Sequence, residues 1–181
     1  MLSPSQRTQL LQIARESIAA TLSGRTYRVD VATFDADLQR PSGAFVTLHT
    51  LDGDLRGCIG SIIAAEPLYQ AVASSAIHAA TRDPRFDRVA IDELASLHIE
   101  ISVMSPIVAV RDVEEIVVGR DGLIIRRGAR AGLLLPQVAT DHGWDRETFL
   151  QHTCAKAGLP GDAWRSPDCR IERFSAEVFS E

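Results

Sequence analysis

The chain has 181 residues, of which 45% are hydrophobic and 24% are charged, and its formal net charge at pH 7 is −5. This balance excludes a disordered or fibrous protein and predicts a single domain over residues 1–181, with room for a small subdomain. The negative charge argues against a nucleic-acid-binding protein. The lack of about 18 consecutive apolar residues argues against a membrane span.

The chain is a mixture of predicted helices and antiparallel strands. A helix is predicted over 5–23 from apolar residues at three- and four-residue steps, and a polar loop over 25–43 with a short helical turn near 34–38. Strands are predicted over 44–51, 55–63, 97–104, 122–127, 130–135 and 170–179. Further helices are predicted over 68–82, 136–142 and 145–156, while 113–118 fits either a strand or a short helix. Such a mixture is typical of the α+β class.

Cysteine usage and the first residues of the chain bear on the cellular compartment. The three cysteines are Cys58, Cys154 and Cys169; their number is odd and no two of them form a CxxC pair. Neither a disulfide framework nor a zinc ribbon is therefore expected. The first residues lack the basic start and apolar core of a signal peptide. We expect a reduced, cytoplasmic protein.

The richest chemistry lies in the predicted strand at 55–63, within the run Leu-Arg-Gly-Cys-Ile-Gly. Side chains alternate between the two faces of a strand, so Arg56 and Cys58 are expected on one face, and Leu55 and Ile59 on the core face. A neighbouring guanidinium favours the thiolate form of a cysteine.

Two interpretations of this run remain open. Gly57 and Gly60 remove bulk on either side of the thiol, which permits a bulge or the close approach of a ligand or of another backbone. Cys58 is then either a reactive or ligand-contacting thiol, or a buried cysteine that packs like a small apolar residue.

Other candidate residues lie outside this strand. Asp83 can accept hydrogen bonds from free amides or pair with Arg85, in a turn that is either part of the site or purely structural. Glu100, on the polar face of its strand, can act as an acid, a base or a metal ligand, but one carboxylate does not define a metal site. The helical His78 is more typical of a surface or core residue than of a ligand. No phosphate-binding loop, dinucleotide fingerprint, serine-hydrolase elbow or HExxH helix occurs.

Several motifs together resemble those of the AMMECR-domain family, in its order and approximate spacing. They are LRGCIG at 55–60, RDPRF at 82–86, ISVMSP at 101–106, GLII at 122–125, LPQVA at 135–139 with GWD at 143–145, and KAG at 156–158. The resemblance covers nearly the whole chain, from about Leu10 onward. LRGCIG is the most specific of these motifs.

The resemblance implies an α+β fold, with a mainly antiparallel sheet flanked by helices, a smaller subdomain and a cleft between the two. The family has no settled biochemical activity. Its prokaryotic members resemble protein A of the AmmeMemoRadiSam system, whose gene neighbours encode Memo-like and radical-SAM proteins, so these are the implied partners. Matched by motif, the implied site residues are Arg56, Gly57, Cys58, Gly60, Asp83, Arg85 and Lys156.

Two functional hypotheses follow. In the first, the protein is an enzyme or an enzyme subunit: Cys58 is the nucleophile or thiol ligand, Arg56 and Arg85 bind a small anionic ligand, and Glu100 or His78 supplies a general base. In the second, the same strand is the surface of a binding or adaptor module. This hypothesis rests on the absence of a complete set of catalytic residues in the sequence.

A metal site is a third option, with Cys58 and either His78 or Glu100 as ligands, but no ligand spacing supports it. The sequence does not identify a cofactor.

Overall fold

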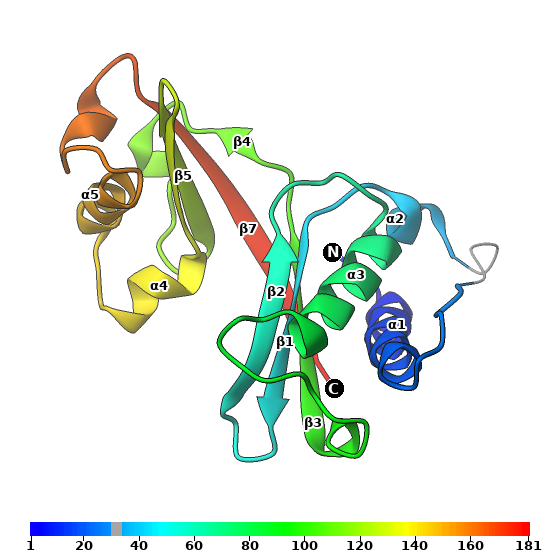
Figure 1. The fold of residues 1–181 in the computed structure, drawn as a ribbon. Helices are drawn as coiled ribbons and strands as arrows, with labels where there is room; N and C mark the ends of the chain where they lie inside the picture. Colours follow the sequence, from blue (N-terminus) through cyan, green and yellow to red (C-terminus); the bar gives the residue numbers. More distant parts are fainter. Residues whose placement is uncertain (30–33) are drawn as a thin grey trace. The chain divides into compact units, whose positions relative to one another are not determined.

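The structure is a computed structural model that describes residues 1–29 and 34–181 (Figure 1). It divides into two compact units. Unit 1 comprises Met1–Met104 and Glu177–Glu181, and unit 2 comprises Ser105–Ala176. The fold is α+β with antiparallel strand pairing, as the sequence predicts. No helix in the described ranges is both long and apolar enough to cross a membrane.

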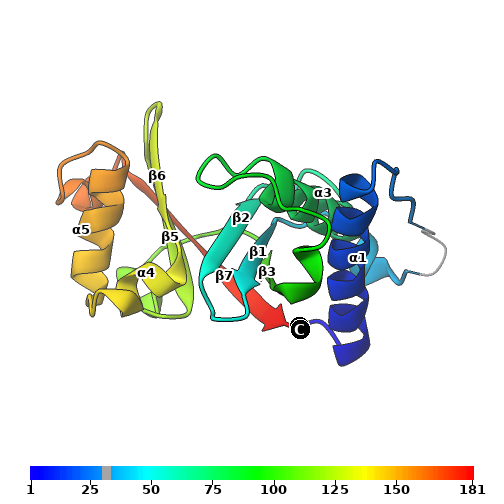
Figure 2. The ribbon, with the colours of Figure 1, turned by 60° about the horizontal axis from the view of Figure 1, so that its bottom comes forward.

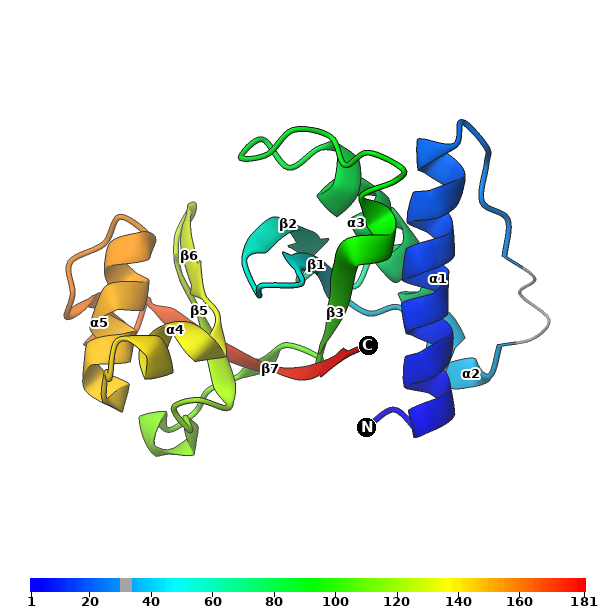
Figure 3. The same cartoon turned by 90° about the horizontal axis from the view of Figure 1, so that it is seen from below.

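Unit 1 is a sheet with helices on one face. Its elements are α1 (Pro4–Leu22), α2 (Ala36–Gln39), β1 (Ala44–Thr50), β2 (Leu55–Ser61), α3 (Leu68–Thr81), η2 (Leu94–Ser96), β3 (Leu97–Met104) and the end of β7 (Arg170–Ser180). The strand order is β2-β1-β3-β7, so β2 is an edge strand. Helix α3 packs on β1 and β2, and α1 packs on α3 and β3 (Figure 3).

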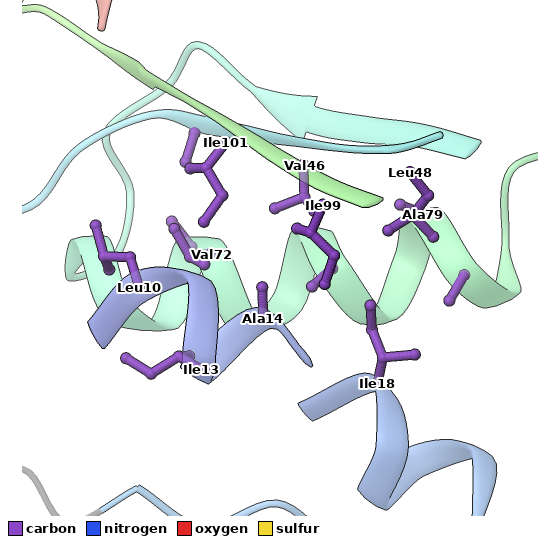
Figure 4. Packing of buried hydrophobic residues seen from close by; sticks show 14 of the residues in the cluster. Leu10, Ile13, Ala14, Ile18, Val46, Leu48, Val72, Ala79, Ile99 and Ile101 are labelled. Carbon is purple, nitrogen blue, oxygen red and sulfur yellow. The ribbon is translucent and has the colours of Figure 1, made fainter. Parts of the chain in front are cut away.

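The core of unit 1 lies between these helices and the sheet (Figure 4). Leu10 and Ile18 of α1, Val72 of α3, and Val46 and Ile99 of the sheet are all essentially inaccessible to solvent. Alternation along β1 and β3 sends every second residue into this core and leaves the residues between them on the other face. Those intervening residues are half-buried and mostly polar, which creates a polar sheet face.

Unit 2 is a smaller antiparallel sheet with its own core. Its elements are β4 (Val108–Ala109), η3 (Val113–Glu115), β5 (Asp121–Arg127), β6 (Arg130–Leu134), α4 (Pro136–Asp141), α5 (Arg146–Lys156), η4 (Ala163–Arg165) and most of β7. Strand β5 pairs with β6 and β7, and β4 pairs with β7. Helix α5 packs on β5 and β6 (Figure 2). Phe149 and Leu123 lie in the centre of this core.

Local signals explain where the helices begin. Ser3 and Gln6 form a capping box at the start of α1, and the Asp145 side chain accepts a hydrogen bond from the Thr148 N–H at the start of α5. Gly158, with a φ of 70°, follows α5 in the left-handed conformation that a β-carbon disfavours.

Most element boundaries agree with the sequence prediction within two residues, with a few differences. The ambiguous segment 113–118 contains a 3-10 turn at Val113–Glu115, and the short strand Val108–Ala109 was not predicted. Strand β2 ends at Ser61, two residues early. Part of the predicted loop 25–43, residues 30–33, lies outside the described residues.

Candidate functional site

The polar sheet face of unit 1 carries a thiol, a hydroxyl and a carboxylate in one cross-strand row. Thr47 of β1 pairs with Cys58 of β2 on one side and with Glu100 of β3 on the other. Thr47 Oγ1 lies 3.3 Å from Cys58 Sγ and donates a hydrogen bond to it. Adjacent strands lie about 4.8 Å apart, which puts the Cα atoms of Cys58 and Glu100 roughly 10 Å apart. Among the described residues, the Glu100 carboxylate makes no hydrogen bond to the Cys58 thiol, so the role of Glu100 as an acid or base stays a prediction.

The main chain of Cys58 is held from outside the sheet. Because β2 is an edge strand, the Cys58 N–H has no strand partner on its outer side, and it donates instead to Asp83 Oδ2 at 2.8 Å. Arg85 Nη2 lies 3.5 Å from the Cys58 carbonyl oxygen. Asp83 and Arg85, which follow α3, thus take the place of a missing strand at this one residue and block strand addition there.

Asp83 is itself fixed by Arg85. The Arg85 guanidinium donates to both carboxylate oxygens, from Nε to Oδ1 at 3.0 Å and from Nη2 to Oδ2 at 2.7 Å. The Arg85 main-chain N–H also donates to Oδ1. The Asp83 side chain is 2% exposed, whereas that of Arg85 is 54% exposed. Hydrogen bonds from Arg85, followed by those from the Cys58 and Arg85 N–H groups, hold the pKa of Asp83 well below its usual value.

Arg56 is engaged elsewhere. Its guanidinium binds Glu93 through Nε at 2.5 Å and Nη2 at 3.1 Å, and its Nη1 donates to the carbonyl of Asp87. Its side chain is 17% exposed. The hydrogen bond from Arg56 lowers the pKa of Glu93. The structure thus gives Arg56 an internal carboxylate partner, and its role in binding an anionic ligand stays a prediction.

A bulge in β2 changes which residues share a face. Leu48 pairs with Gly57 but His49 pairs with Leu55, so Arg56 is an extra residue in the ladder. A one-residue slip reverses the faces beyond it. The prediction that Leu55 faces the core is therefore wrong: Leu55 is 37% exposed. Ile59, which follows the bulge in β2, packs against the core as predicted.

Backbone packing accounts for the two glycines of the LRGCIG run. A β-carbon on Gly57 would lie 2.3 Å from the carbonyl oxygen of Ala79 in α3. One on Gly60 would lie 2.3 Å from the Ala44 carbonyl oxygen and 2.5 Å from the Phe45 ring. Of the features that the sequence analysis associates with these glycines, the structure shows the close approach of another part of the backbone at both positions, in addition to the bulge at Arg56. Gly57 faces α3, which places its neighbour Cys58 on the polar face.

The structure adds polar-face residues that the sequence analysis did not single out. Thr47 and His49 lie on this face of β1, and His49 pairs directly with His98 of β3. The available signal was the alternation of β1, in which 45 and 47 fall between buried positions and 49 follows one. That signal cannot be used without knowing that β1 lies between β2 and β3.

The remaining candidate residues lie on elements other than the strands that carry Cys58, Thr47 and Glu100. His78 is half-buried in the last turn of α3, and Lys156 ends α5 in unit 2 with an exposed side chain. Cys154 is inaccessible and Cys169 is half-buried, and burial raises the pKa of both thiols. Within residues 1–29 and 34–181, no three His, Cys, Asp or Glu side chains come together as a metal site.

Comparisons with known proteins agree with the fold and motifs. Residues 11–179 match the family model AMMECR1. The chain is 40% identical to Protein MJ0810 of Methanocaldococcus jannaschii, an alignment that covers 100% of this chain and 92% of that protein. It is 45% identical to Protein MK0488 of Methanopyrus kandleri, over 95% of this chain and 86% of that protein.

A solved structure is similar over nearly the whole chain. It is described as the crystal structure of the uncharacterized protein PH0010 from Pyrococcus horikoshii, with a TM-score of 0.80 and 40% identity, covering 96% of this chain and 90% of that one. The family model, the relatives and this fold agree with the resemblance read from the motifs: the chain belongs to the AMMECR1 family.

Proposed function

We propose that the protein is a thiol-dependent enzyme, or the thiol-bearing subunit of one, that acts on a small anionic ligand at the polar face of unit 1. Cys58 is the nucleophile, Arg85 receives the anionic group, and Glu100 contacts the far end of the ligand. The observation that carries the proposal is the position of Arg85. Its Nη2 lies 3.5 Å from the Cys58 carbonyl oxygen, yet its side chain is half exposed.

Arg85 and Arg56 differ in what they offer to a ligand. Arg56 is mostly buried and bound to Glu93, so its guanidinium has little free surface. Arg85 uses Nε and Nη2 on Asp83 and keeps its solvent side open to a carboxylate or phosphate group. The anionic end of a ligand therefore lies beyond the edge of β2, beside the thiol.

The row across the sheet sets the size of the ligand. A ligand that touches Cys58 and Glu100 lies over Thr47 and spans about two strand spacings, roughly 10 Å between the Cα positions. Thr47 holds the sulfur by its hydrogen bond, and Glu100 accepts a hydrogen bond from a donor at the other end of the ligand. Such a span is within the length of a small metabolite.

A pair of alkylating reagents tests this proposal. Iodoacetate carries a carboxylate and iodoacetamide is its neutral analogue, so the ratio of their rates at Cys58 measures recruitment of the anion. We expect this ratio to be higher in the native protein than in the urea-unfolded chain, and to fall to the unfolded value in Arg85→Gln. Rates are followed at Cys58 by peptide mass spectrometry, with Cys169 as the internal reference. Equal ratios of the iodoacetate and iodoacetamide rates in the native and unfolded protein would contradict the proposal.

A binding or adaptor function is the second candidate, and one observation favours it. Among the described residues no side chain other than Thr47 hydrogen-bonds to the Cys58 sulfur, so no general base is in place. In this alternative the polar face binds a partner protein, for which the family resemblance points to Memo-like and radical-SAM proteins. Cys58→Ser would then leave co-purification with such a partner intact, whereas the enzyme proposal expects loss of the cellular function with this variant.

A further inference from the structure

Two arginines face each other across the antiparallel pair β5–β7 in unit 2. Arg126 and Arg170 are direct cross-strand neighbours, and side chains at such positions lie about 5 Å apart at Cβ. Like charges at these positions repel one another. Of the two, Arg126 forms an ion pair, from its Nε to Glu172 Oε2 at 2.9 Å. Arg170 makes no ion pair or side-chain hydrogen bond with any part of the chain that the structure describes.

The surrounding charges reinforce this pair. The end of β5, the start of β6, and the start of β7 with the segment before it carry four guanidiniums and two carboxylates, namely Arg126, Arg127, Arg130, Arg170, Asp168 and Glu172. This local excess of positive charge occurs in a chain of formal net charge −5. An uncompensated guanidinium beside a second one is a setting that favours a bound anion, because both groups match the geometry of phosphate oxygens.

A surface cavity opens at this place. It has a volume of about 330 Å³ and is lined by Arg126, Gly128, Asp168 and Arg170. The volume lies at the lower end of the range for small-molecule sites. Gly128 has a φ of 58°, which fits the first central position of a tight hairpin turn, and a β-carbon there would meet nothing within 4 Å. The glycine turn therefore leaves its side of the cavity open.

We propose that this cavity binds a small phosphate monoester that carries free hydroxyl groups. The phosphate lies between Arg126 and Arg170 and relieves their repulsion. Asp168, which is exposed and already binds Arg127 and Ser166, accepts a hydrogen bond from a ligand hydroxyl. Unlike the proposed thiol chemistry, this site requires no residue of unit 1, so either proposal can fail without the other.

Binding of two probes to the full chain tests the site. Inorganic phosphate and ribose 5-phosphate are titrated at constant ionic strength while the backbone amide signals of Gly128 and Arg170 are followed by NMR. We expect saturable shifts with both probes and an affinity about tenfold higher for ribose 5-phosphate, because only it offers sugar hydroxyls to Asp168 beyond the phosphate. Shifts that rise linearly without saturation would overturn the site. Equal affinities would overturn the assignment of a hydroxyl-bearing ligand.

Matched variants separate this site from general charge attraction. Arg170→Ala should weaken binding of both probes at least about tenfold, because one of two guanidiniums is lost. Arg111→Ala removes the same charge from an exposed position elsewhere in unit 2 and should leave both affinities within about twofold. Asp168→Asn should remove the preference for ribose 5-phosphate and retain phosphate binding. If Arg111→Ala weakens binding as much as Arg170→Ala, the interaction is nonspecific and the proposal fails.

Discussion

Two aspartates with nearly the same local chemistry occupy different places in the two units. Asp83 in unit 1 and Asp121 in unit 2 have side chains that are 2% and 1% exposed, and each binds a half-exposed arginine within two residues in sequence. Each also accepts a backbone N–H. For Asp121 this N–H belongs to Val117, four residues away, whereas Asp83 accepts one from Arg85 and one from Cys58, which is 25 residues away.

The difference shows that a buried Asp–Arg pair can either close a local turn or join two segments that are distant in sequence. The contacts of Asp121 with Val117 and Arg120 close a local turn at the start of β5. Asp83 ties the segment after α3 to an edge strand and fixes the residue that carries the thiol. A second cation, Arg173 Nη1, lies 3.7 Å from Asp121, whereas Arg85 is the only cation that the structure places in an ion pair with Asp83 across its described ranges.

Replacing the arginine of each pair should have the largest effect on the free energy of unfolding, and the loss should differ between the two pairs. Arg85→Ala leaves the buried Asp83 charge without a cation, and we expect a loss of about 2–3 kcal/mol in the free energy of unfolding. Arg120→Ala should cost less, because Arg173 still faces Asp121. Urea unfolding at pH 7 measures both. Equal losses would show that Arg173 does not compensate for Arg120.

Acid should weaken both pairs. The lowered pKa of Asp83, caused mainly by hydrogen bonds from Arg85, means that its ionised form stabilises the folded state above the ordinary carboxyl pKa of about 3.9. This contribution is lost as the pH falls from about 5 through 3.9 toward the lowered folded-state pKa. Asp83→Asn should therefore show a shallower loss of stability between pH 5 and pH 3 than the parent protein.

Unfolding midpoints measured at several pH values, with Asp92→Asn as an exposed carboxylate control, provide the comparison. Asp121→Asn should behave like Asp83→Asn. Burial opposes the lowering of the Asp121 pKa, but hydrogen bonds from Arg120 and the Val117 N–H, with the charges of Arg120 and Arg173, outweigh it. A parent protein with the same pH slope as Asp83→Asn would contradict this account.

Cysteine labelling should distinguish the Asp83–Arg85 pair, which contacts Cys58, from the local Asp121–Arg120 pair. The expected effect is smaller than the changes in stability above. In the native protein iodoacetamide should modify Cys58 before Cys154, because Cys154 is inaccessible and burial raises its pKa, which lowers its thiolate fraction at any given pH. Arg85→Ala should change the rate at Cys58 several-fold through its main chain, whereas Arg120→Ala should not. Peptide mass spectrometry reads both sites. An identical Cys58 rate in the two variants would show that the Asp83–Arg85 pair does not position the thiol.

An exposed Arg–Asp pair should show the smallest loss in the free energy of unfolding when its arginine is removed. Arg40 and Asp37 form an ion pair whose side chains are 71% and 55% exposed. Arg40→Ala should change the free energy of unfolding by no more than about 0.5 kcal/mol, because solvent screens such pairs. The same urea titration applies. A loss as large as that of Arg85→Ala would mean that burial does not explain the difference between these pairs.

Much of the fold was predictable from local signals. The steps of three and four residues in α1 and the alternation in β3 are patterns that one element carries within itself, and both were predicted within one residue. The turn that joins β1 and β2 has a local signal of the same kind in Asp52-Gly53, where Gly53 has a φ of 88°. The short strand Val108–Ala109 was missed because two residues carry no period; it is a strand only because β7 pairs with it.

The candidate site was predictable only in part. The sequence places Cys58 on a strand beside Arg56 and Asp83 before Arg85, because these relations are local. The bulge that makes Arg56 an extra residue, and the Glu93 carboxylate that engages it, depend on the pairing of β1 with β2 and on the segment before β3. No spacing in the sequence indicates either of them.

The sequence by itself therefore determined the types of element, the α+β class and the family. These follow from periodicity, turn residues and short motifs, all of which are properties of neighbouring residues. Only the tertiary structure decided which charges neutralise each other, and that Cys58, Thr47 and Glu100 form one row. In that row Thr47 lies 11 positions from Cys58 and 53 positions from Glu100. Such relations are set by strand order and by which groups burial forces into contact.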